Sequence, residues 1–142
     1  MHGLGNDFAV IQTLNQTFTP TKNRIQTMAN RRTGIGFDQL LLLERNTQQN
    51  ADFNYRIFNA DGNEVGNCGN GARCIGLYIK QQQLLNKPLI QLKTRDRILQ
   101  VLLNDNSILV NMGIPDFEPS SMPYLGKTSS YTHTIEVENQ TI

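Results

Sequence analysis

The sequence predicts an α+β domain in which a mixed, mostly antiparallel sheet packs against a central helix. Three observations support this prediction. Apolar and polar residues alternate with the period of a strand in several short segments. One longer amphipathic segment in the middle of the chain is typical of a helix. The predicted elements do not alternate regularly between strand and helix, so a doubly wound fold is not expected.

The first part of the chain predicts strands on both sides of one helix. The expected strands are residues 8–12, 39–44 and 53–58. The second contains four consecutive leucines, which indicate a buried strand, and the third alternates in the manner of a half-buried strand. Between the first two, Thr19 followed by Pro20 is typical of a helix N-cap and a first helical residue. Thr33-Gly34 is a plausible end of this helix.

The second part of the chain predicts the central helix followed by further strands. The helix is expected at residues 69–83, and strands are expected at 89–94, 97–103, 107–112 and 131–137. The polar residues 104–106 favour a hairpin. Prolines and serines cluster after Gly113, which is typical of a linker. We therefore expect one domain over residues 1–113, and a linker with the beginning of a second domain over residues 114–142.

Composition excludes several classes of function. A net charge of +1 does not favour binding to nucleic acid or to a membrane surface by charge. No apolar run approaches the roughly 20 residues of a membrane span, and the first residues lack the features of a signal peptide. Two cysteines at this spacing do not form a disulfide framework. A reducing cytoplasm is the expected location.

Cys68 is the strongest candidate for a catalytic residue. It lies among glycines at the predicted start of the central helix, where unpaired N–H groups and the helix dipole favour negative charge. A thiol at such a position has a lower pKa than a free cysteine, and the same N–H groups can hold a carboxylate. From the local sequence alone, a reactive thiol and a small buried side chain both remain open.

The other candidate groups are weaker when each is considered alone. Cys74 lies in the second turn of the predicted helix and is interpreted as a packing residue. The cysteine and histidine spacing does not fit a zinc site, so no metal is expected. The glycine pairs lack the third glycine of a dinucleotide loop. Carboxamides suit a zwitterionic ligand, and the candidates are Asn6, Gln39, Asn59 and Asn70.

Taken together, several segments resemble the diaminopimelate epimerase family. They are residues 1–8, 32–41, 56–62, 68–74 and 111–115, and they occur in the family's order. The run Cys-Gly-Asn-Gly-Ala-Arg-Cys at 68–74 is similar to the family's active-site signature. The resemblance implies a barrel-like sheet around a central helix, as one of two pseudo-symmetric halves. It also implies a homodimer for the full-length protein.

The resemblance further implies an isomerase that needs neither pyridoxal phosphate nor another cofactor. Members of the family interconvert LL- and meso-diaminopimelate for the synthesis of lysine and peptidoglycan precursors. They use two cysteines on opposite sides of the substrate's α-carbon. Cys68 aligns with the first of these cysteines. Side chains that align with substrate-contacting residues are Asn6, Gln39 and Asn59. Gly69 and Asn70 align with the amides that hold the reacting carboxylate.

The chain departs from the family pattern in one decisive respect. The family's second cysteine belongs to a second half, and no second motif of this kind occurs before Ile142. We therefore expect this chain to be an N-terminal half that is inactive alone.

Two alternatives remain open at this stage. Relatives with the same architecture act on proline, hydroxyproline or ring compounds, so the substrate can differ. In the second alternative, the chain is a thiol redox sensor or a non-catalytic binding domain. Cys68 would then be the oxidised residue and Cys74 its resolving partner. The six-residue separation on a helix makes that disulfide geometrically awkward.

Overall fold

The computed structural model describes residues 1–121, 136–137 and 140–141. The chain divides into two compact units, Met1–Met112 and Gly113–Ile142. In the second unit, a 3-10 helix spans Pro119–Ser121, and β9 (Glu136–Val137) pairs antiparallel with β10 (Gln140–Thr141). Most of the strand predicted at 131–137 lies outside the described residues. That this unit begins a second domain stays a prediction.

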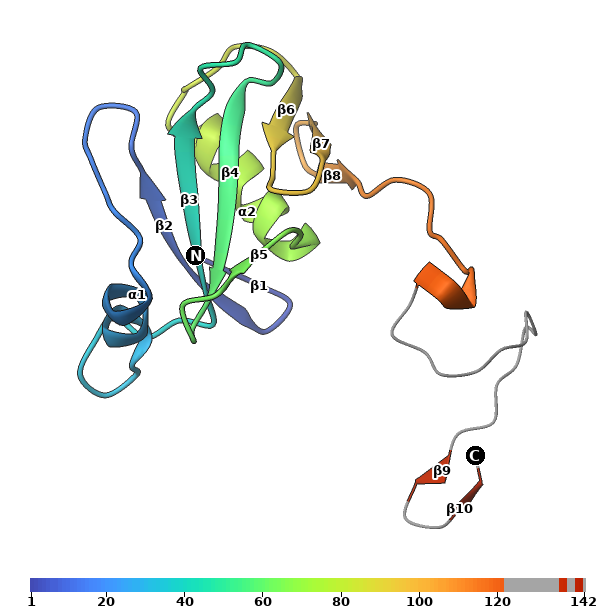
Figure 1. The fold of residues 1–142 in the computed structure, drawn as a ribbon. Helices are drawn as coiled ribbons and strands as arrows, with labels where there is room; N and C mark the ends of the chain where they lie inside the picture. Colours follow the sequence, from blue (N-terminus) through green and yellow to red (C-terminus); the bar gives the residue numbers. More distant parts are fainter. Residues whose placement is uncertain (122–135, 138–139, 142) are drawn as a thin grey trace. The chain divides into compact units, whose positions relative to one another are not determined.

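The first unit is a mixed sheet with two helices (Figure 1). Its strands are β1 (His2–Gly3), β2 (Asn6–Gln12), β3 (Gln39–Arg45), β4 (Phe53–Asn59), β5 (Glu64–Val65), β6 (Leu89–Lys93), β7 (Ile98–Leu103) and β8 (Ile108–Asn111). Its helices are α1 (Lys22–Ala29) and α2 (Gly69–Gln81). Within the described residues, no helix has the length and apolar character needed to cross a membrane.

The sheet is mostly antiparallel, as the sequence predicts. The strand order is β1-β2-β3-β4-β6-β7-β8, and β5 pairs with β4 outside this path. Only β2–β3 and β4–β6 pair in parallel. The chain forms α1 between the first of these pairs and α2 between the second, because parallel neighbours need a crossover connection.

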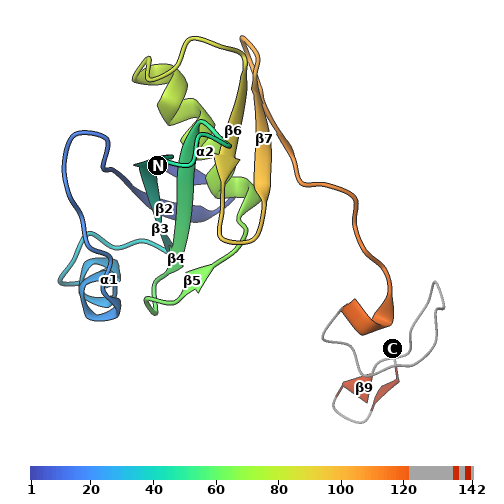
Figure 2. The same ribbon diagram turned by 45° about the horizontal axis from the view of Figure 1, so that its top comes forward.

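The four leucines of β3 explain how the two helices are arranged. Leu40 and Leu42 pack with residues of α1, whereas Leu41 and Leu43 pack with residues of α2. Successive side chains of a strand point to opposite faces, so a strand covered on both sides is apolar throughout. All four leucines are fully buried. Figure 2 shows α1 and α2 on opposite sides of β3 and β4.

The sheet curls around α2 to form a half-barrel. Helix α2 contacts β1, β2 and β3 at one end of the strand order and β7 and β8 at the other. Close approach depends on Gly76, since a Cβ atom there would lie 2.8 Å from a methyl group of Val101. The buried face of α2 includes Ala72, Ile75 and Ile79. The predicted central helix and half-barrel are both present.

The sequence prediction of the ends of α1 was wrong by several residues. Thr21, not Thr19, is the N-cap, and its hydroxyl accepts a hydrogen bond from the Arg24 N–H at 3.3 Å. Pro20 therefore precedes the helix instead of opening it. The helix ends at Ala29, before the predicted Thr33-Gly34 stop. Gly34 closes the following turn, where its N–H donates to the Asn30 carbonyl at 2.8 Å.

The remaining boundaries differ from prediction by one or two residues. The central helix begins at Gly69 as expected but ends at Gln81, and Gln83 then adopts a left-handed conformation with φ 51°. The two-residue strands β1 and β5 were not predicted. Segments this short carry no detectable periodicity, and they form because longer neighbours supply their hydrogen bonds.

Candidate active site

Cys68 is the N-cap residue of α2. Its backbone is extended, and its sulfur accepts a hydrogen bond from the Gly71 N–H at 3.3 Å. The Cys68 carbonyl accepts the first helical hydrogen bond, from Ala72 N–H at 2.9 Å. The side chain is half-buried and contacts the core beneath α2. The sulfur therefore lies at a helix opening, as the sequence predicts, and not deep within the core.

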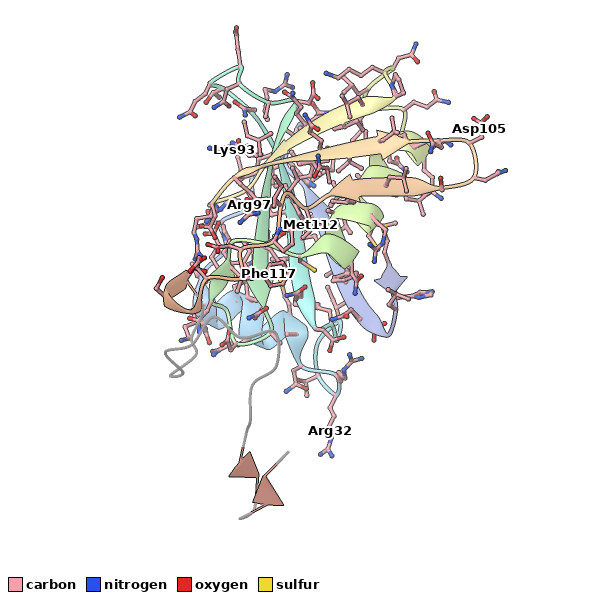
Figure 3. The ribbon with its side chains drawn as sticks, turned by 90° about the vertical axis from the view of Figure 1, so that its right-hand side faces the viewer. Arg32, Lys93, Arg97, Asp105, Met112 and Phe117 are labelled. Carbon is pink, nitrogen blue, oxygen red and sulfur yellow. The ribbon has the colours of Figure 1, made fainter. Side chains whose placement is uncertain are left out.

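The first turn of α2 offers further N–H groups beside this sulfur. Among the described residues, no acceptor is found for the N–H groups of Gly69 and Asn70. Such groups, with the positive end of the helix dipole, form a site for an anion. Met112 lies against this turn, and a Cβ on Gly69 would be 3.2 Å from its sulfur. Figure 3 shows Met112 beside the helix, at the end of β8.

The three predicted substrate-contacting carboxamides on strands share one face of the sheet. Each lies two residues from a side chain that packs in the core beneath α2; these neighbours are Phe8, Leu41 and Ile57. Because strand side chains alternate, Asn6, Gln39 and Asn59 also point to the α2 face. Gln39 pairs in register with Asn59 and with Phe8. The three carboxamides therefore lie at the same end of adjacent strands.

Hydrogen bonds divide the predicted polar side chains into two pairs. The Gln39 side-chain N–H donates to Asn59 Oδ1 at 2.8 Å, and Gln39 Oε1 is buried without a partner among the described residues. The Asn70 side-chain N–H donates to Asn6 Oδ1 at 3.4 Å. This second pair joins β2 to the first turn of α2. An unpartnered buried oxygen carries a free-energy cost, so a ligand that donates to it would be favoured.

Two residues near the site were not predicted from the sequence. The Arg73 guanidinium donates to Asn70 Oδ1, and the Tyr55 hydroxyl donates to the Cys68 carbonyl at 3.4 Å. Burial raises the pKa of Tyr55, so the phenol stays neutral and remains a donor. Arg73 could have been found from its three-residue spacing from Asn70 on a helix. Tyr55 shows no such signal, because its contact depends on how α2 packs over β4.

Cys74 lies apart from this group. It is buried, its thiol donates to the His2 carbonyl at 3.5 Å, and burial is the main cause of the raised pKa of this thiol. A pocket of about 400 Å³ lies on this side of α2, lined by residues that include Asn70, Cys74, Leu77 and Ile108 but not Cys68. Within the described residues, no cluster of His, Cys, Asp and Glu side chains could hold a metal ion.

The different surroundings of the two cysteines predict different reactivity. We expect iodoacetamide near pH 7.5 to modify Cys68 about 10-fold faster than Cys74, since burial limits access to Cys74 and reduces its thiolate fraction. Peptide mapping by mass spectrometry over a time course measures both rates. Equal rates in the folded chain would contradict the assignment of Cys68 as the reactive thiol.

Comparison with known sequences identifies the family. The diaminopimelate epimerase family model matches residues 1–118. The diaminopimelate epimerase of Legionella pneumophila (strain Corby) is 49% identical over 140 residues, covering 98% of this chain and 50% of that protein. The one from Coxiella burnetii (strain Dugway 5J108-111) is 44% identical over 143 residues, covering 100% of this chain and 52% of that protein. The chain thus spans about half the length of these curated relatives.

Solved structures with low sequence identity share the fold. A phenazine biosynthesis PhzF-family protein from Enterococcus faecalis has a TM-score of 0.56 at 14% identity, covering 73% of this chain and 36% of that one. A hydroxyproline epimerase from Agrobacterium vitis has a TM-score of 0.53 at 14% identity, with the same coverage. The half-barrel around α2 therefore corresponds to part of a larger known fold. With the match of the family model over residues 1–118, these findings show that the chain belongs to the diaminopimelate epimerase family.

Proposed function

We propose that this chain provides one half of an enzyme that interconverts LL- and meso-diaminopimelate. The observation that carries the proposal is the position of Cys68, a half-buried thiol at the N-terminus of α2 beside two N–H groups. The names of the 44–49% identical relatives support the same substrate. The proposal includes a role in the synthesis of lysine and peptidoglycan precursors. It also includes a cytoplasmic location and a homodimer of the full-length protein.

In the proposed mechanism, the Cys68 thiolate removes the proton from the substrate's α-carbon. The electron pair of the broken C–H bond spreads onto the adjacent carboxylate. The N–H groups of Gly69 and Asn70 stabilise this charge, because they are fixed in place before the reaction and need no reorganisation. The α-proton of an amino acid is a very weak acid, so both a positioned base and this stabilisation are required.

The carboxamides bind and orient the substrate in this proposal. Asn6, Gln39 and Asn59 present donors and acceptors without net charge, which suits a ligand carrying both ammonium and carboxylate groups. Gln39 Oε1, buried and without a partner among the described residues, is suited to accept from a substrate ammonium group. Asn70 contributes its side chain to the Asn6 pair while its backbone N–H faces the carboxylate.

Inversion of configuration needs a second acid on the opposite side of the α-carbon. A single thiol would return the proton to the face from which it came. Cys74 does not suit this role, since it is buried and its thiol donates to the His2 carbonyl. We therefore propose that the second thiol comes from another half of the protein, in line with the chain spanning about half of its relatives.

An assay in deuterium oxide tests the proposal. We expect the intact enzyme, meaning this chain joined to a second half, to form meso-diaminopimelate from the LL isomer with deuterium at the α-carbon. The 142-residue chain alone should show no sustained turnover. Chiral chromatography with mass spectrometry measures both. Turnover by the isolated chain would contradict the need for a second half, and no turnover of any diaminopimelate isomer by the intact protein would refute the proposed substrate.

A further inference from the structure

Arg31 joins the starts of two strands that carry predicted substrate-binding residues. Its guanidinium donates to Asp7 Oδ2 at 2.8 Å and to Asp38 Oδ1 at 3.0 Å. Asp7 follows Asn6 in β2, and Asp38 immediately precedes Gln39 at the start of β3. A single side chain therefore bridges the two backbone segments from which the Asn6 and Gln39 carboxamides project.

The same two aspartates are connected through the backbone. The Asp7 N–H donates to Asp38 Oδ2 at 2.8 Å, and the Asp38 N–H donates to the Asp7 carbonyl at 2.9 Å. Each oxygen of the Asp38 carboxylate thus has its own donor, one from Arg31 and one from Asp7. Hydrogen bonds from Asp7 and Arg31 also lower the pKa of Asp38, which keeps this carboxylate ionised near neutral pH.

The turn after α1 fixes the position of Arg31. The Ile35 and Gly36 N–H groups donate to the Met28 carbonyl at 2.9 and 3.0 Å, which folds this turn back onto the end of the helix. Gly36 has φ 77°, and a Cβ there would lie 3.1 Å from the Arg31 Cα. Gly36 therefore packs closely on the Arg31 backbone, which directs the guanidinium to the strand starts.

We propose that Arg31 is a positioning residue for substrate binding, because it holds β2 and β3 so that Asn6 and Gln39 meet the substrate together. The expected effect on KM rests on the proposed function. The effect of Arg31 on the positions of β2 and β3 does not depend on that function. Among the described residues, the Arg31 guanidinium donates hydrogen bonds to the two aspartates alone, and it acts through them. An exposed ion pair is screened by solvent and contributes little to stability, so the effect of Arg31 is expected on the site and not on global unfolding.

Replacing Arg31 with methionine in the intact enzyme tests this role. We expect KM for diaminopimelate to rise about 10-fold while kcat stays within about threefold, because binding groups are displaced and the thiol is not. Hydrogen exchange of the Asp7 and Asp38 amides should become at least about 10-fold faster, as both donate within the bridge. The thermal midpoint should change by no more than about 2 °C.

Two further variants sharpen the test. Arg32→Met removes the neighbouring guanidinium, which is exposed, points away from the body of the first unit in Figure 3 and makes no ion pair among the described residues. It should leave KM and exchange unchanged. The KM of Arg31→Lys should lie between those of the wild type and Arg31→Met, because an ammonium group lacks the planar fork that reaches two carboxylates at once.

The outcomes separate the two proposals. Wild-type exchange rates at Asp7 and Asp38 in Arg31→Met would overturn the positioning role, even in a fully active enzyme. An unchanged KM, or complete rescue by lysine, would overturn it as well. If the intact wild-type protein acts on no diaminopimelate isomer, the proposed function fails, and faster exchange in Arg31→Met would still support the positioning of the strands.

Discussion

Cys68→Ala is expected to lower the rate of epimerisation by the intact enzyme by about 10³-fold or more. A positioned general acid or base contributes about 10²–10⁴-fold, and each thiol of a two-base mechanism is required in both directions of the reaction. The alanine variant keeps the backbone N–H groups of α2 and the carboxamides of the strands. Binding of diaminopimelate should therefore persist while proton transfer is lost.

A serine variant distinguishes loss of chemistry from loss of structure. Serine is among the preferred N-cap residues, so Cys68→Ser retains a side-chain acceptor for the Gly71 N–H that now donates to the sulfur. Its hydroxyl is a far weaker acid than a thiol and cannot serve as the base. We expect Cys68→Ser to fold as the wild type does and to be as inactive as Cys68→Ala.

Cys74→Ala is the matched control for both variants. It removes the other thiol, which is buried and hydrogen-bonded to His2, and activity should stay within about threefold because this sulfur is no part of proton transfer. Progress curves with LL-diaminopimelate, together with substrate binding by calorimetry, measure these effects. Retention of a tenth or more of wild-type activity by Cys68→Ser would rule out Cys68 as the base.

The parts of this fold that could be predicted are those encoded within one segment. Four consecutive leucines indicated a buried strand, and β3 is covered by α1 on one side and α2 on the other. Cys68 among glycines indicated a helix start, and α2 begins at the next residue. These signals are strong because periodicity and capping act over a few neighbouring residues.

The features that sequence reasoning missed depend on contacts between distant segments. Asp7 and Asp38 are 31 residues apart, and only the parallel pairing of β2 with β3 brings them to one guanidinium. Thr19 followed by Pro20 predicted the cap of α1 at Thr19, whereas the structure has the N-cap at Thr21. The Tyr55 contact with Cys68 joins β4 to the N-cap of α2, 13 residues away in the sequence. Tertiary packing, not local preference, sets the Arg31 bridge and the Tyr55 contact.

Gly71→Ala is expected to destabilise the 142-residue chain by about 2 kcal/mol. An added Cβ would lie 2.4 Å from the Tyr55 hydroxyl oxygen and 3.0 Å from a methyl carbon of Leu41. Overpacking of a core typically costs about 1–3 kcal/mol, and a contact this short belongs at the upper end. Alanine favours a helix over glycine by about 0.5–1 kcal/mol, which offsets only part of that cost. Urea unfolding gives the free energy of unfolding.

A second substitution shows whether the tyrosine hydroxyl is the cause. Tyr55→Phe removes the oxygen that meets the new Cβ, and with it the 3.4 Å hydrogen bond to the Cys68 carbonyl. Alone it should cost about 1 kcal/mol, as expected for one buried hydrogen bond. In the Gly71→Ala background the same change should instead stabilise the chain, because relief of the clash outweighs the lost bond. If the double variant loses as much free energy of unfolding as the two single variants added together, the close contact between Gly71 and the Tyr55 hydroxyl is contradicted.

Gly3→Ala is the control for glycine replacement as such. Its Cβ would meet Cys74 Sγ at 3.6 Å, an ordinary van der Waals contact, so stability should change by less than about 0.5 kcal/mol. Gly71 differs because its N–H donates to the Cys68 sulfur. A shift of the first turn of α2 away from Tyr55 would therefore move the thiol as well. The rate of Cys68 alkylation in Gly71→Ala should therefore differ from the wild-type rate. In the double variant Gly71→Ala with Tyr55→Phe, the rate should return to the wild-type value.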